Sequence, residues 1–206
     1  MSSILEGLAR HLDADTIARL GQQIGADPEM TSQAIQIALP VIISGLANNA
    51  SSPEGAGALD SALARDHDGS LLDDLGGLLG GASGGGNGAA LDGIGILAHI
   101  LEGRQDAVQG GLSRATGLSG SQVLRLLALL APIVMAYLGR QKQANNMDAD
   151  AIGDALRNER TRLDEHESGI GGMLGQLLDK NHDGSVADDI FRMAPGVLGG
   201  LFGRKS

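Results

Sequence analysis

The feature that most constrains the fold of this chain is a long apolar segment that occurs twice. The first copy reads SQAIQIALPVIISGL and ends at residue 46, and the second reads SQVLRLLALLAPIVMAYL and ends at residue 138. Internal similarity at a fixed spacing predicts a structural unit that is built twice. A constant offset of 92 relates three pairs of residues in and just before these segments: Gly25 and Gly117, Pro40 and Pro132, and Leu46 and Leu138.

Each copy carries the start signals of a long helix. Gly25 and Gly117 are of the residue type that ends a preceding helix, and Asp27 or Ser119 follows as a candidate N-cap. The proline inside each apolar segment removes a helical hydrogen bond and costs about 3 kcal/mol or more in an ordinary helix interior. We therefore expect either one kinked helix or two helices that meet at the proline, with a functional hinge as the alternative.

The similarity between the copies continues downstream of the apolar segments. The tetrapeptide HDGS begins at His67 and again at His182, and an Asp pair follows each occurrence after two residues. The sequence GGASGGGNGAA between the copies has no apolar period and is typical of a flexible linker. We predict two diverged tandem units: a first unit at residues 1–79, a linker at 80–90, and a second unit at 91–206 with a charged helical insert at about 157–178.

The pattern of apolar residues predicts an all-α fold. No run of residues alternates with a period of two over the length of a strand, and β-branched residues are sparse. With one Tyr, two Phe and no Trp, the core has to consist of Leu, Ile, Val, Ala and Met side chains. We expect the Pro-containing apolar helices to form the centre of each unit.

Composition excludes several classes of partner. A formal net charge of -10 repels the phosphate backbone of nucleic acids and an anionic membrane surface. The scarcity of aromatic residues also removes the stacking platforms that single strands use, so we expect no nucleic-acid partner.

The absence of cysteine excludes a thiolate metal site and a Cys nucleophile. Because it also fits a reducing compartment, we predict a cytoplasmic protein.

The sequence predicts neither a signal peptide nor a membrane span. Residues 1–20 have a helical apolar period and early charges, and they lack the basic start and apolar run of a signal peptide. The longest apolar stretch, residues 126–138, contains Pro132 and is shorter than the roughly 20 residues that a spanning helix needs. We expect this stretch to be a buried core helix.

The second HDGS segment lies in a sequence that resembles the front half of an EF-hand calcium loop. Oxygen-bearing side chains stand at positions 1, 3 and 5 of such a loop, and Gly184 stands at position 6, where the chain turns sharply. Position 12, a bidentate Glu in an EF-hand, is Ile190, and an Asp pair comes one or two residues earlier. A shortened loop closed by that pair is a candidate calcium site, with possible ligands Asp179, Asn181, Asp183, Asp188 and Asp189.

A turn followed by a helix cap explains the shared part of both motifs without an ion. Asp-Gly favours a turn, the following Ser would cap the next helix, and the Asp three residues later would complete a capping box. The candidate pairs are Ser70 with Asp73 and Ser185 with Asp188. The first copy is the poorer calcium candidate because Ala64 stands at its first ligand position. A transition-metal site at His67 or His182 is a third alternative.

The other titratable clusters favour structural roles. His99 lies in the apolar stretch ILAHIL, where we expect a satisfied core or interface histidine. The acidic and histidine residues at 164–167 are typical of a solvated helix face. No Ser lies in a Gly-x-Ser-x-Gly elbow, and no Gly run leads to a Lys-Ser or Lys-Thr pair, so the chain shows no catalytic or phosphate-binding signature.

Several of these segments together resemble the YidB-like family of bacterial proteins of unknown function. The resemblance rests on five segments: ALPVIISGL at residues 38–46, PEG at 53–55, HDGS at 67–70, GILAHI at 95–100 and LAP at 130–132. It covers roughly residues 5–139, and the HDGS motif recurs near the C-terminus. The resemblance implies a bacterial protein, and it supplies no catalytic residues.

The sequence therefore predicts a non-enzymatic binding or assembly module that acts through a protein partner or through self-association. This prediction rests on the duplication, the many small residues and the Gly-Leu segments at residues 76–81 and 195–203. The alternative is a calcium-binding or calcium-stabilised protein that uses the loop at residues 179–189.

Overall fold

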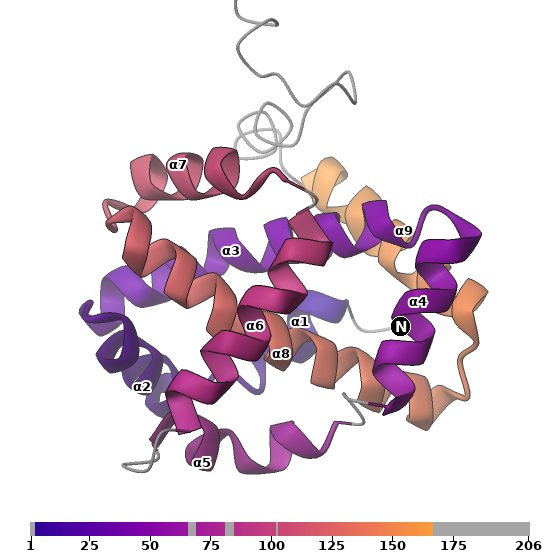
Figure 1. The fold of residues 1–206 in the computed structure, drawn as a ribbon, viewed down its shortest axis with the longest axis horizontal. Coiled ribbons are helices and arrows are strands. Elements are labelled where there is room, and N and C mark those ends of the chain that lie inside the picture. Colours follow the sequence, from indigo (N-terminus) through magenta and orange to yellow (C-terminus); the bar gives the residue numbers. More distant parts are fainter. Residues whose placement is uncertain (1–2, 66–68, 81–84, 102, 167–206) are drawn as a thin grey trace, which may run out of the picture. The chain divides into compact units, whose positions relative to one another are not determined.

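The computed structural model describes residues 3–65, 69–80, 85–101 and 103–166 (Figure 1). All regular elements in these ranges are helical, which confirms the predicted all-α fold class. The elements are α1 (Ile4–Ala9), α2 (Ala14–Ile24), α3 (Pro28–Asn49), α4 (Pro53–Arg65), the 3-10 helix η1 (Ser70–Asp74), α5 (Leu75–Gly80), α6 (Gly85–Leu101), α7 (Gln105–Thr116), α8 (Gly120–Asn145) and α9 (Ala149–His166).

The core is built around α3 and α8. Residues 38–47 of α3 and 126–139 of α8 are buried without interruption, so both helices are covered on all sides. α6 packs along α8 and crosses in front of it in Figure 1, while α3 packs against α8, α9, α2 and α7. As the composition requires, the fully buried side chains are almost all Leu and Ile, with Ala and Val between them.

Each proline lies inside one continuous helix. Pro40 is buried within α3 and Pro132 is buried within α8, so the alternative of two helices meeting at the proline is wrong. The helices continue because tertiary packing outweighs the local cost of the proline: the apolar residues on both sides of it are buried against neighbouring helices.

The two long helices begin with the same local geometry. α2 ends at Gly25 with a left-handed φ of 73°, and the side chain of Asp27 accepts a hydrogen bond from the Met30 amide at the start of α3. α7 ends at Gly117 with a φ of 76°, and Ser119 forms a capping box with Gln122 at the start of α8. Both predicted N-caps are therefore confirmed.

These two helix junctions also touch each other. The side-chain amide of Gln122 donates a hydrogen bond of 2.8 Å to the carbonyl oxygen of Gly25. The start of α8 is thereby tied to the end of α2, across a sequence separation of 97 residues. The second acidic motif lies outside the described residues, so the tandem duplication as a whole stays a prediction.

The helices of the two predicted units pack into one compact unit, which spans Met1–His166. α3 and α4, from the first predicted unit, contact α8 and α9, from the second. α6 begins at Gly85, so residues 85–90 of the predicted linker are helical. The charged insert predicted at 157–178 starts within α9, and its residues from 167 onward lie outside the described ranges.

Among the described residues, two helices, α3 and α8, are long and apolar enough to cross a membrane by length and composition alone. The most apolar windows of these helices are 72% and 83% buried inside the structure, and the core helices of soluble proteins pass the same test. The stretch at residues 126–138 is part of a 26-residue helix, so its length does not argue against a span, although its burial fits the predicted core role.

Candidate functional site: an apolar pocket

The calcium loop predicted at Asp179, Asn181, Asp183, Asp188 and Asp189 lies outside the described residues. Among the residues that the structure describes, no three His, Cys, Asp or Glu side chains are grouped so that they could hold a metal ion. The calcium interpretation of the second motif therefore stays a prediction from the sequence.

The end of the first acidic motif is fixed to α8. Gly69 has a φ of 96° and is the N-cap residue of η1, so the predicted cap at Ser70 is wrong. Asp73, the predicted partner of Ser70 in a capping box, instead accepts a hydrogen bond of 2.6 Å from Arg140 Nη2. Arg140 Nη2 also donates to the Gly69 carbonyl oxygen at 2.9 Å. Because Asp73 is largely exposed, this ion pair contributes at most about 1 kcal/mol and serves mainly to position η1.

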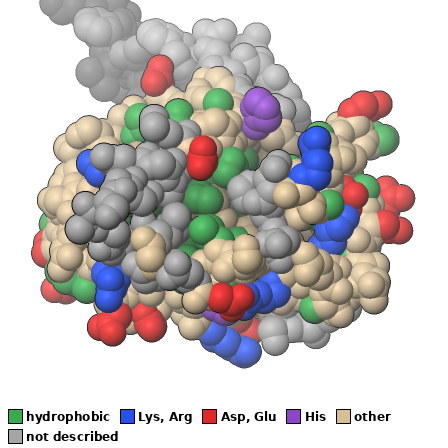
Figure 2. Space-filling model, turned by 60° about the horizontal axis from the view of Figure 1, so that its bottom comes forward, with side chains coloured by type: hydrophobic (Ala, Val, Ile, Leu, Met, Phe, Trp, Pro, Cys, Tyr) green, Lys and Arg blue, Asp and Glu red, His purple; other side chains and the backbone are tan. Residues whose placement is uncertain are grey.

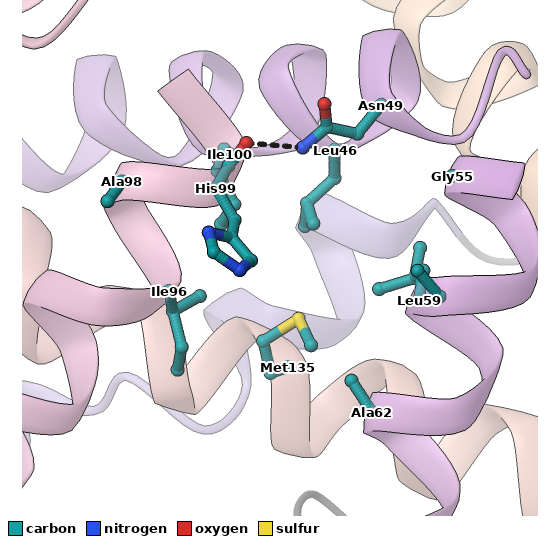
Figure 3. Close-up of a pocket in the computed structure, with 11 residues that line it drawn as sticks. Leu46, Asn49, Gly55, Leu59, Ala62, Ile96, Ala98, His99, Ile100 and Met135 are labelled. Atoms are coloured by element: carbon teal, nitrogen blue, oxygen red, sulfur yellow. Dashed lines mark hydrogen bonds between the residues drawn. The ribbon is translucent and has the colours of Figure 1, made fainter. Parts of the chain in front are cut away.

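An apolar pocket of about 450 Å³ lies between α3, α4, α6 and α8 (Figure 3). In this view α6 forms one wall, α4 forms the opposite wall, the end of α3 lies above and Met135 of α8 lies at the base. The pocket is lined by Leu46, Asn49, Gly55, Ala58, Leu59, Ala62, Ile96, Ala98, His99, Ile100 and Met135.

The ends of α3 and α6 meet at the top of the pocket. A Cβ built on Gly45 would stand 2.5 Å from Cγ2 of Ile100, so only glycine allows α3 to approach α6 this closely. The side-chain amide of Asn49 donates a hydrogen bond of 2.6 Å to the carbonyl oxygen of His99, which Figure 3 shows as a dashed line. These two contacts fix one end of the pocket.

Small residues on α4 leave the space that the pocket occupies. Gly55, Ala58 and Ala62 recur at i, i+3 and i+7, so they share one face of the helix, and this face lines the pocket. Leu59, beside them, is buried, and Met135 closes the base from α8. This spacing of small residues is visible in the sequence, but the sequence does not show that α6 lies opposite.

The chemistry of the lining is that of an aliphatic binding site. Among the described residues that line the pocket, His99 is the titratable one and Asn49 is the other polar one. The His99 side chain is exposed and Figure 3 shows its ring turned toward the pocket, so the core role expected for it is wrong, and the alternative role at an interface stays a prediction. The pocket can bind an apolar group through the hydrophobic effect, with one imidazole and one amide available for orientation.

Figure 2 shows one face of the molecule. Hydrophobic side chains gather near the middle of the view in a hollow, with acidic and basic side chains nearby. Ile94 of α6 is an exposed large hydrophobic residue, with 46% of its surface accessible. The surface around α6 is therefore less polar than the net charge of the chain suggests.

A buried carboxylate lies on α9, in the part of this helix that belongs to the predicted charged insert. Glu159 is only 3% exposed, and its Oε1 accepts hydrogen bonds from the Ser3 hydroxyl and, at 3.1 Å, from the Leu5 amide. Its burial has a signal in the sequence, because Ile152, Leu156 and Glu159 follow the i, i+4, i+7 spacing of a buried helix face. Glu159 thus attaches α1 to α9.

The comparison with known protein families identifies the relatives of the chain. The family model described as "Bacterial protein of unknown function (DUF937)" matches residues 6–141, which is more than half of the chain. The chain belongs to this family. The match confirms the resemblance to YidB-like proteins. No curated protein and no solved structure matched the chain.

The matched residues of this DUF937 protein include all the residues that line the pocket. They also include both Pro-containing helices up to residue 141, and they exclude all of α9, including Glu159. The pocket therefore lies within the matched part of the chain, whereas the attachment of α1 to α9 involves sequence outside the match.

Proposed function

We propose that this DUF937 protein is a non-enzymatic binding module that accepts an apolar group of a protein partner in the pocket between α3, α4, α6 and α8. The observation that carries the proposal is the aliphatic lining of the pocket: the described residues that line it include no Asp, Glu, Lys or Arg. Each buried methylene contributes about 0.8 kcal/mol, so one Leu or Ile side chain of a partner would contribute ~1.5–3 kcal/mol.

The lining favours binding over catalysis. General acid–base or nucleophilic chemistry needs at least two groups within hydrogen-bond reach of each other, such as a nucleophile and a base. In the pocket His99 faces aliphatic side chains, and the Asn49 side-chain amide already donates to a backbone carbonyl. A bound apolar group would be held there without a group poised to react with it.

The net charge supports a protein as the source of that group. A chain with a charge of -10 is repelled by nucleic acid and by anionic membranes, whereas a basic or neutral protein surface can approach. A cytoplasmic location remains part of the proposal and is supported by the cysteine-free sequence.

The experiment uses 1-octanol as a neutral aliphatic probe and methyl NMR of the full chain labelled at Met and Ile. We expect saturable shifts of the methyl signals of Met135, Ile96 and Ile100, because these side chains line the pocket. Ala62→Phe should fill the pocket from α4 and abolish the shifts, and Ala58→Phe provides a second filling variant.

The matched control is Ala144→Phe, which adds the same aromatic ring at an exposed position of α8 that is not part of the pocket lining. This variant should bind octanol like the wild type. Shifts spread evenly over all methyl signals, or unchanged shifts in both filling variants that still fold, would contradict the proposal.

A further inference from the structure

We infer that the exposed face of α6 is an interface with a second copy of this chain. We call the exposed residues Asp92, Ile94, Gly95, Ala98 and His99 the α6 face. The opposite side of the helix is buried: Leu97 and Ile100 are 1% and 2% exposed. Ile94, 46% exposed, is the large hydrophobic side chain that the described part of the protein leaves open to solvent.

Helix geometry divides the α6 face into two edges. At 100° per residue, Ile94 and Ala98 lie along one edge, Asp92 and His99 lie along the other, and Gly95 lies between them. A Cβ built on Gly95 would meet no atom within 4 Å, so the middle of the face is open. Figure 1 shows α6 crossing the side of the molecule that faces the viewer.

The α6 face is complementary to itself in the antiparallel direction. If two copies are related by a two-fold axis near Gly95, Ile94 of one copy lies against Ala98 of the second copy, and Asp92 lies opposite His99 of the second copy. The first contact places a large side chain on a small one. The second pairs a carboxylate with an imidazole that can donate an N–H to it. The two-fold axis makes each contact occur twice.

A second copy fits this face better than a strongly charged partner does. The face carries one carboxylate and one imidazole at opposite ends, so its polar groups are matched by its own reversed pattern. One helix pair buries less than the roughly 800 Å² per partner of a standard interface, so we expect a weak, concentration-dependent dimer. The charge of -10 on each chain opposes association, and screening by salt should therefore strengthen it.

The α6 face and the pocket share Ala98 and His99, whereas Asp92, Ile94 and Gly95 belong to the α6 face alone. The inference does not depend on the pocket binding an apolar group. The Ala62→Phe variant separates the two proposals: filling the pocket should leave the dimer unchanged, since Ala62 lies on α4. A protein that binds octanol but stays monomeric would contradict the dimer alone.

The experiment exploits the absence of cysteine from the chain. Gly95→Cys introduces one thiol near the predicted two-fold axis, and mild oxidation should link two full-length chains by a disulfide. The matched control is Gly110→Cys, also at a helical glycine, in α7, where a Cβ would meet only Arg114 Nη1 at 4.0 Å. We expect at least a several-fold larger dimer fraction for the Gly95→Cys variant.

Sedimentation velocity of the cysteine-free chain is the second measurement. The sedimentation coefficient should rise with protein concentration for the wild type and for Ala62→Phe. Ile94→Asp should abolish this rise. Because Ile94 is exposed, we expect this variant to fold like the wild type. Equal cross-linking of the two Cys variants, or a concentration-independent monomer in the wild type, would overturn the inference.

Discussion

The backbone of Gly93 in α6 lies directly against the carbonyl oxygen of Ala128 in α8, so that a Cβ at position 93 would overlap this oxygen. Ala128 is the residue four positions before Pro132, and its carbonyl therefore lacks the helical N–H that a non-proline residue would supply. The proline that weakens α8 locally and the glycine that lets α6 approach thus belong to one contact. It lies where the two helices pack along each other.

Replacing this glycine should separate the two helices. We expect Gly93→Ala to lower the free energy of unfolding by about 1–3 kcal/mol or more, because the added methyl group meets backbone that cannot move aside. Gly95→Ala on the same helix is the matched control: its Cβ has open space, and alanine should stabilise the helix by up to about 1 kcal/mol. Urea unfolding followed by circular dichroism measures both, and equal stabilities would contradict the contact.

Glu159 should be needed to hold α1 in place. Glu159→Ala leaves the Leu5 amide and the Ser3 hydroxyl without their acceptor, which should destabilise the protein by about 1–3 kcal/mol. The amides of α1 should also exchange with solvent faster, since this carboxylate joins α1 to α9. Glu165→Ala, at an exposed position of the same helix, should change neither quantity by more than about 0.5 kcal/mol. If the amide exchange rates of α1 are unchanged in Glu159→Ala, the hydrogen bonds of Glu159 are not needed to hold α1 in place.

Stability should fall at alkaline pH through Tyr137. Burial raises the pKa of its phenol above the ordinary value of 10.0, while a hydrogen bond from Gln141 acts in the opposite direction. Between the unfolded and the folded pKa the native state keeps a proton that the unfolded state has lost. The free energy of unfolding therefore decreases as the pH rises through this window.

Because Tyr137 is the one tyrosine of a chain without Trp, phenolate absorbance reports on it alone. We expect a titration midpoint above 10 in the native protein and a midpoint near 10 in urea. Tyr137→Phe should remove the tyrosine contribution to alkaline destabilisation. Coincident midpoints in the native and the unfolded protein would disprove the effect of burial.

The effect of calcium on Tm distinguishes the two interpretations of the second acidic motif, a calcium site and a turn with a helix cap. If Asp179, Asn181, Asp183 and the following Asp pair bind calcium, millimolar calcium after EDTA treatment should raise Tm. A ligand at 100 times its Kd stabilises by ~2.7 kcal/mol, which corresponds to several degrees. Asp179→Ala should remove the rise. If the motif is a turn with a helix cap, Tm should be independent of calcium in both proteins.

Helix ends and helix caps could be predicted from the sequence where they depend only on neighbouring residues. The left-handed Gly25 and Gly117, and the caps at Asp27 and Ser119, depend on residues within one helical turn, so their chemistry is readable from the sequence. The predicted cap at Ser70 is wrong because η1 begins one residue earlier than expected, with the left-handed Gly69 as its N-cap, and Asp73 pairs with Arg140 of the distant helix α8. Glu159 also depends on distant residues: the groups that donate hydrogen bonds to its carboxylate, the Ser3 hydroxyl and the Leu5 amide, come from the opposite end of the described chain.

By itself, the sequence determined the helical class, the starts of the two long apolar helices and membership of the family. These follow from apolar period, caps and composition, which act over a few residues. Only the tertiary structure decided that both halves share one core, that Gly93 meets Ala128, and that the small residues of α4 face α6 across a pocket. The physical reason is that a pocket or a close helix contact depends on which helices are brought opposite each other. That placement is set by the packing of side chains distant in sequence, whose pairing no local pattern specifies.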